Sequence, residues 1–257
     1  MKPNTNPKPA LTMEESVGQV DTVRALGPIY ASLKLQGMYI TEEYRLHHKI
    51  HATVNFILSN IMYYACFIIE LFFVKSLKQL LENLPMNICV TSCNVKFCVI
   101  LKLRPHLIKI NQLLNRLDKR PMTARQSRKL ENVIRDCKRI TLAIMALYLT
   151  LNSMYTLNGA VSNYTRLLYD IWVPYHWEHN HSLFWVYLFM QYAFQIQLSL
   201  ENVANDFIGA LYLNVLNTHL EIIMERFAKL HHDPNASEEE SMQKFKEYVE
   251  DHRIIME

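Results

Sequence analysis

Two stretches of aromatic and polar side chains have the residue types and spacing of a surface that binds small molecules. Tyr148, Asn152, Tyr155 and Gly159 recur at intervals of four, three and four residues, which places them on one face of a helix. A second helical face carries Tyr187, Gln191 and Phe194. Apolar ligand pockets combine aromatic walls with a few groups that orient the ligand by hydrogen bonds. The same residue types also pack helix against helix, so the spacing alone leaves both interpretations open.

The residue patterns that carry enzyme chemistry are missing from this sequence. It contains no G-x-S-x-G, no H-E-x-x-H and no phosphate-binding loop. His176, His179 and His181 cluster beside Trp177 and Glu178, and such side chains can bind metal. A solvated loop with amphipathic rings at the level of the lipid headgroups fits them better. The five cysteines match no zinc or disulfide pattern and are interpreted as small apolar fillers. We therefore expect no enzyme, no metal and no cofactor.

The candidate binding faces belong to a chain with four long apolar segments. A spanning helix needs about 20 mostly apolar residues, and four stretches meet this, 52–74, 80–101, 140–165 and 182–200. We predict an all-α fold, a polytopic membrane helical bundle with four transmembrane helices. The expected organisation is an N-terminal segment 1–51, a transmembrane region 52–214 and a helical tail 215–257, with a linker at 102–139 and an outer loop at 161–181.

Few charged residues interrupt the apolar segments. Glu70, Lys96, Glu201 and Asp206 are charged side chains within or near the predicted spans. A charge at the midplane of the bilayer would mark an ion pathway or a proton relay. Each of these residues instead falls toward one end of its span, and we interpret them as anchors at the membrane interface.

The fourth apolar segment continues into a heptad pattern outside the membrane. Its apolar positions recur at alternating spacings of three and four residues, at Leu213, Leu216, Leu220, Ile223, Phe227 and Leu230. Polar residues flank them, so this part of the helix lies in water. We predict that Leu216, Leu220, Ile223 and Phe227 pack against a helical partner, and we call these four residues the seam.

The distribution of basic residues predicts the orientation of the chain. Residues 1–51, 102–139 and 215–257 hold 23 of the 27 Lys and Arg residues, and the positive-inside rule places these segments in the cytoplasm. The loop 161–181 then faces outward, and two glycosylation sequons at Asn163 and Asn180 fall in it. A net charge of only +3 gives no basic signature for nucleic acid.

Two stretches resemble the insect odorant receptor family. The first, from Ile171 to Trp177 and then from Phe184 to Tyr192, is similar to the family's second outer loop leading into helix four. The second, from Asn205 to Leu211 and from His219 to Leu230, is similar to the inner extension of that helix. The order of the segments and the inside N-terminus agree with this resemblance, which covers residues 40–257.

The resemblance implies a multi-pass receptor of the plasma membrane that detects volatile small molecules. Family members gate a cation channel as hetero-oligomers with an odorant co-receptor, and the pore is lined by a seventh helix. The resemblance also implies a ligand pocket among the outer halves of the helices, at the depth of the two faces that begin with Tyr148 and Tyr187. The sequence stops after the fourth helix of the family's seven. We therefore expect it to be the N-terminal, truncated portion of such a receptor.

Two other interpretations remain open at the level of sequence. A gustatory receptor fragment would have similar topology but other ligands, and the segment that distinguishes the two classes lies in the last helix. A four-helix transporter subunit or membrane adaptor would be complete as it stands. The pattern that continues to Ile254 and Ile255 favours a longer protein.

Overall fold

The computed structural model describes residues 20–41, 43, 45–162, 167–175, 177, 180–230 and 237–256. Throughout these residues the secondary structure is helical, without strands. The elements in chain order are η1 (Thr22–Leu26), α1 (Gly27–Leu35), α2 (Leu46–Asn55), η2 (Phe56–Tyr63), α3 (Tyr64–Phe73), α4 (Leu77–Asp118), α5 (Ala124–Ala160), α6 (His181–Leu230) and α7 (Glu238–Met256). The prediction of an all-α fold is confirmed.

Four helical segments are long and apolar enough to cross a membrane. They are the continuous α2–η2–α3 segment Leu46–Phe73, then Leu77–Asp118, Ala124–Ala160 and His181–Leu230. Each contains or overlaps one of the four predicted spans. The helices extend well beyond those stretches, and the predicted linker 102–139 is helical except at residues 119–123. At 50 residues, α6 is roughly 75 Å long, more than twice the thickness of the hydrocarbon core.

Side chains at the helix starts explain why the long helices begin where they do. The Ser76 hydroxyl accepts from the Gln79 amide at the start of α4. At α5, Thr123 and Gln126 form a reciprocal capping box. At α6, the Asn180 side-chain oxygen accepts from the Ser182 and Leu183 amides, at 3.1 and 3.2 Å. These contacts satisfy amides that have no partner within the helix.

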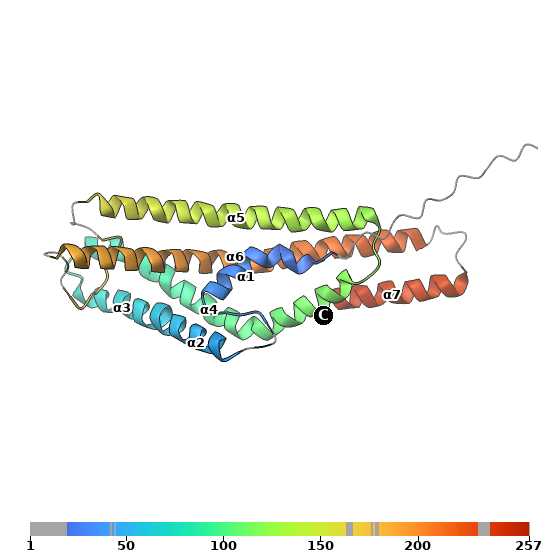
Figure 1. The fold of residues 1–257 in the computed structure, drawn as a ribbon, viewed down its shortest axis with the longest axis horizontal. Helices are drawn as coiled ribbons and strands as arrows, with labels where there is room; N and C mark the ends of the chain where they lie inside the picture. Colours follow the sequence, from blue (N-terminus) through green and yellow to red (C-terminus); the bar gives the residue numbers. More distant parts are fainter. Residues whose placement is uncertain are drawn as a thin grey trace, which may run out of the picture.

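Most of the deeply buried apolar side chains gather beyond one end of the spans. Figure 1 shows α5 and α6 running side by side, with α1 against α6 and α7 beside the far end of α6. We call this the α7 end of the bundle, and the opposite end the loop end. The main core lies toward the α7 end and combines η1, α1, α4 and α6, with Leu26, Ile29, Leu33, Leu107, Leu114, Leu117, Leu211 and Val215 among its members. A smaller core at the loop end includes Tyr63, Phe67, Val90 and Ile171.

The N-terminal segment is part of this core, which its mildly amphipathic sequence did not indicate. The helix α1 ends in a Schellman motif, in which the Met38 amide donates to the Leu33 carbonyl at 2.8 Å and the Gly37 amide to Lys34 at 3.0 Å. Gly37 has a φ of 88°, and a Cβ there would meet the Ala52 backbone at 2.5 Å. Glycine is therefore required where the chain turns from α1 toward the first span.

Buried hydrogen bonds hold the N-terminal segment in place. The Asp118 carboxylate accepts from the amide and the hydroxyl of Thr22, each at 2.8 Å. Tyr30 of α1 and Tyr212 of α6 both donate to the side-chain oxygen of Asn111, at 2.9 and 2.8 Å. These bonds link three helices at the α7 end.

The final helix is docked by one buried carboxylate. Asp251 of α7 lies 2.8 Å from Arg120 Nε and 3.8 Å from Arg226 Nη1. Its side chain is 2% exposed and that of Arg226 is 11% exposed. Burial lowers the pKa of Arg226, and the nearby Asp251 charge opposes that shift. Removing the carboxylate leaves a buried guanidinium without its partner.

Replacing Asp251 with alanine should therefore release α7 from the bundle. The loss of about 1–3 kcal/mol of local stability predicts that trypsin cleaves at Lys244 and Lys246 roughly tenfold faster or more. Glu247→Ala removes an exposed carboxylate from the same helix and should leave the cleavage rate near that of the native chain. Equal cleavage rates in the two variants would show that Asp251 does not dock α7.

Candidate ligand-binding site

A cavity of about 260 Å³ lies among α4, α5 and α6 in the spanning part of the bundle. Tyr169 of the loop that connects α5 to α6 also contributes to its wall. The lining residues are Cys89, Tyr148, Leu151, Asn152, Tyr155, Tyr169, Gln195, Leu198, Ser199 and Asn202. Three tyrosine rings and two leucines form apolar walls, and amide and hydroxyl groups are interspersed among them. This combination can enclose a small molecule and orient it by hydrogen bonds.

Hydrogen bonds between α5 and α6 set the shape of this cavity. The buried Asn152 amide group donates to the Ser199 hydroxyl at 2.8 Å. One residue further along α5, the Ser153 and Tyr192 hydroxyls lie 3.0 Å apart. On the α4 side, Asn202 approaches the Cys89 sulfur at 3.9 Å. In an apolar surrounding such contacts hold helices together, because the polar groups have few alternative partners.

The structure brings some of the predicted ligand-binding residues together and separates others. Tyr148, Asn152 and Tyr155 of α5 line the cavity as one face. Gly159 lies a turn closer to the loop end and lines a second cavity of about 520 Å³, which Tyr155 also borders. Tyr155 therefore lies at the boundary between the two spaces.

The three predicted residues of α6 do not line this cavity. Gln191 is fully buried, and its side-chain oxygen accepts from the Leu168 and Tyr169 amides at 2.9 and 3.4 Å. Its amide group donates to the Tyr169 carbonyl at 2.9 Å. Phe194 stacks on Tyr63 with ring centroids 4.3 Å apart, and Tyr187 is buried. Gln191 thus fixes the loop that carries Tyr169 to the cavity wall.

The sequence analysis missed the deeper wall of the cavity. Gln195, Ser199 and Asn202 recur at spacings of four and three residues, so a polar face of α6 was visible in the sequence one to two turns beyond the chosen residues. Cys89 and Tyr169 gave no such signal, because they reach the cavity from another helix and from a loop.

Two of the charged residues near the spans form an ion pair with each other. Lys96 Nζ of α4 lies 2.7 Å from the Asp206 carboxylate of α6. Glu201, one turn before Asp206, is 3% exposed. The sequence pattern predicted separate interfacial anchors, and only the packing of α4 on α6 shows that two of these charges neutralise each other.

The remaining predicted sites are placed as follows. Ile223 of the seam is buried, Leu216 and Leu220 are half-buried, and Phe227 contacts the rings of Phe245 and Tyr248 on α7. Leu213, the first residue of the heptad pattern, is 69% exposed. Asn180 is exposed at the start of α6. Asn163, His176 and His179 lie outside the described residues.

The four long apolar helices define a multi-pass helical membrane protein, and a cavity lies among three of them, α4, α5 and α6. The family model described as 7tm Odorant receptor matches residues 76–257, which is more than half of the chain. The chain belongs to this odorant receptor family. That assignment agrees with the resemblance found in the sequence and favours it over the gustatory and transporter interpretations.

Curated relatives and a solved structure show similarity over different parts of the chain. Odorant receptor 33a of Drosophila melanogaster is 30% identical over 101 residues, which cover 39% of this chain and 27% of that protein. Odorant receptor 59a of the same species is 22% identical over 208 residues, 78% of this chain and 51% of the relative. The chain thus spans about half, or less, of the length of these relatives.

The solved insect olfactory receptor OR5 from Machilis hrabei shares the fold, with a TM-score of 0.66 at 18% identity. That match covers 92% of this chain and 64% of the solved one.

The contacts of Gln191 predict that this side chain keeps the loop ordered over the cavity. Gln191→Leu retains the bulk of the side chain but removes three hydrogen bonds to the backbone. The Leu168 and Tyr169 amides should then exchange with deuterium roughly tenfold faster, as hydrogen bonds worth about 1 kcal/mol each are lost. Gln197→Leu, a half-buried glutamine on the same helix, serves as the control. Unchanged exchange at both amides in Gln191→Leu would refute the role of this side chain.

Proposed function

We propose that this chain forms the ligand-detecting part of an odorant receptor subunit, which recognises volatile small molecules and gates a cation channel with a co-receptor. The observation that carries the proposal is the cavity bordered by Tyr148, Asn152 and Tyr155 in the spanning part of a bundle from this family. Its volume of about 260 Å³ suits a small ligand. The curated relatives are named as odorant receptors, in agreement with this function.

The walls of the cavity suggest which ligand chemistry it selects. The rings of Tyr148, Tyr155 and Tyr169 offer apolar faces with a hydroxyl at the edge, and Asn202 and Gln195 offer amides. A ligand with a small apolar body and one hydrogen-bonding group would match this arrangement. A strongly charged ligand would not, because none of the lining residues is an Asp, Glu, Lys or Arg that could pair with it.

The proposal includes the orientation and the location of the chain. We place the protein in the plasma membrane. The basic residues that cluster at the α7 end of the bundle support a cytoplasmic N-terminus and a cytoplasmic tail. The loop end then faces outward, where Asn163 and Asn180 are available for glycosylation. Ligands would reach the cavity from that side.

We further propose that the seam contributes to assembly with the co-receptor. Leu216 and Leu220 are only half-buried within this chain. An apolar surface beyond the spans lies in water, so covering it with helices of other subunits would stabilise an assembly. The pore itself, which the resemblance places on a seventh helix, would come from outside these residues.

The position of Tyr155 at the cavity wall predicts the effect of removing its ring. In a receptor that carries this segment and is expressed with the odorant co-receptor, Tyr155→Ala should raise the half-maximal odorant concentration roughly tenfold, equivalent to about 1.4 kcal/mol of lost binding. Met154→Ala truncates an exposed side chain on the neighbouring face, outside both cavities, and serves as the control. An unchanged dose response in Tyr155→Ala at equal surface expression would contradict the proposed site.

The charge distribution predicts that both ends of the chain are intracellular. Epitope tags attached at residue 1 and at residue 257 should bind antibody only after the cells are permeabilised. A third tag, inserted after Trp177 in the loop, should be labelled in intact cells and controls for delivery to the surface. Labelling of either terminal tag in intact cells would overturn the orientation.

A further inference from the structure

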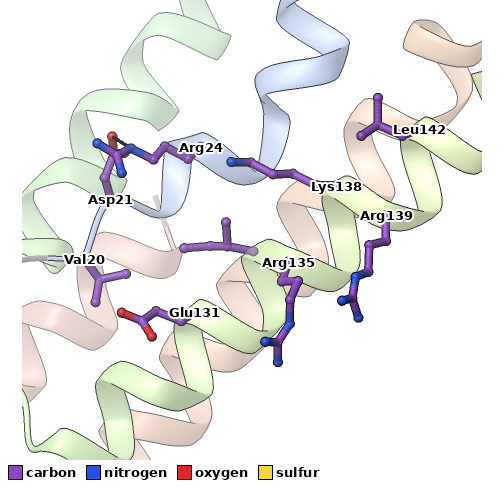
Figure 2. Close-up of a pocket in the computed structure, with 9 residues that line it drawn as sticks. Val20, Asp21, Arg24, Glu131, Arg135, Lys138, Arg139 and Leu142 are labelled. Carbon is purple, nitrogen blue, oxygen red and sulfur yellow. Dashed lines mark ion pairs between the residues drawn. The ribbon is translucent and has the colours of Figure 1, made fainter.

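A separate cavity, distinct from the two near Tyr155, lies at the α7 end of the spans, between η1 and α5. Its volume is about 410 Å³. The lining residues are Val20, Asp21, Arg24, Glu131, Ile134, Arg135, Lys138, Arg139 and Leu142. Figure 2 shows these side chains along one flank of α5 and on the facing N-terminal segment. None of these nine residues lines the cavity among α4, α5 and α6, and none belongs to the seam.

Positive charge dominates this basic cavity. Four cationic side chains, Arg24, Arg135, Lys138 and Arg139, line it together with two carboxylates. One carboxylate, Asp21, pairs with Arg24 at 3.2 Å. Among the residues that the structure describes, Lys138 and Arg139 have no acidic side chain within ion-pair distance.

The charges are ordered along α5 toward the membrane. Glu131 is the farthest from the spanning part, about 13 Å along the helix axis from Ile140, where the uncharged stretch begins. Arg135 lies between them, and Lys138 and Arg139 directly precede Ile140. Figure 2 shows Glu131 at one end of the cavity and Leu142 beyond the cationic side chains at the other. Leu142 is 54% exposed, so an apolar surface adjoins the positive one.

This arrangement matches the layers of a phospholipid. Cations at the end of a spanning helix lie at the level of the headgroup phosphates, and the exposed apolar residues beyond them lie at the level of the acyl chains. Arginine favours phosphate oxygens, because its planar guanidinium can donate two parallel hydrogen bonds. A cavity with several cations also accommodates more than the single phosphate that every phospholipid carries.

We propose that this basic cavity binds the headgroup of an anionic phospholipid that carries additional phosphate groups, with Lys138 and Arg139 contacting the phosphates and Leu142 contacting the acyl chains. The inference rests on the proposed orientation, which places the cavity in the cytoplasmic leaflet. Because α5 also carries Tyr148, Asn152 and Tyr155, a bound lipid would fix the same helix that forms one wall of the odorant cavity.

The test measures lipid binding by the purified chain in neutral detergent, using native mass spectrometry. The probes are a bisphosphorylated phosphatidylinositol, phosphatidylserine and soluble inositol trisphosphate. The bisphosphorylated lipid should bind roughly tenfold more tightly than either of the others, since only it combines several phosphates with acyl chains. Equal binding of the soluble headgroup would indicate a site for free phosphates, and equal binding of phosphatidylserine would indicate general charge attraction. Either result would overturn the proposal.

A pair of double variants separates the cavity from a generally basic interface. Lys138→Gln with Arg139→Gln should weaken binding of the bisphosphorylated lipid roughly 25-fold, about fivefold for each charge removed. Lys49→Gln with Lys102→Gln removes the same charge at the ends of two other spans, outside the cavity, and should change binding by less than about twofold. Equal weakening in both pairs would refute the site.

A charge-preserving exchange guards against misfolding as the explanation. Lys138→Arg with Arg139→Lys keeps both cations in the cavity and should retain most of the binding, with unchanged helix content. Failure of this exchange to bind would also count against the site. The measurement needs neither odorant nor co-receptor and does not depend on orientation in a cell. Its failure is therefore distinguishable from failure of the odorant and tag experiments.

Discussion

Every peptide group within the hydrocarbon layer must find its hydrogen-bond partner inside the protein, because lipid tails offer none. In this chain every apolar span is accordingly helical, and α4, α5 and α6 continue well past their apolar stretches. The α6 helix carries Ser199 at the cavity among α4, α5 and α6 and Tyr212 in the core at the α7 end, within one rod of roughly 75 Å. A continuous helix transmits a shift or rotation along its length. A change at the cavity can therefore reach the part of the bundle where subunits are proposed to meet.

The distribution of packing follows the solvent around each part of the molecule. Apolar side chains gain little by packing in a lipid environment, whereas in water they gain by burial. The main apolar core accordingly lies toward the α7 end, where η1 and α1 bring Leu26, Ile29 and Leu33 against α4 and α6. Within the spans, contacts such as Asn152 to Ser199 and Lys96 to Asp206 hold the helices together. Many apolar side chains there, including Phe189, remain exposed on the surface that faces lipid.

The helix α5 connects two surfaces of opposite character. Toward the loop end it presents Tyr148, Asn152 and Tyr155 to a cavity with uncharged walls, and toward the α7 end it presents Lys138 and Arg139 to a basic one. The capping box at Thr123 fixes the start of the helix, and uninterrupted hydrogen bonding fixes the separation of the two sites. The two proposed sites, one for a small ligand and one for a lipid headgroup, therefore lie on the same helix.

Periodicity and composition by themselves determined the helical class, the number of apolar spans and one face of the proposed ligand cavity. Tyr148, Asn152 and Tyr155 share a face because their spacing matches the helical repeat, which is a local property. Only the tertiary structure decided which faces meet. It assigned Gln191 to the loop backbone and brought Cys89 and Tyr169 to the cavity from other segments. It also buried η1 and α1 in the core, through contacts such as those of Thr22 with Asp118 and of Tyr30 with Asn111. Such contacts join residues far apart in the chain, and helical spacing carries no information about the rotation or partner of each helix.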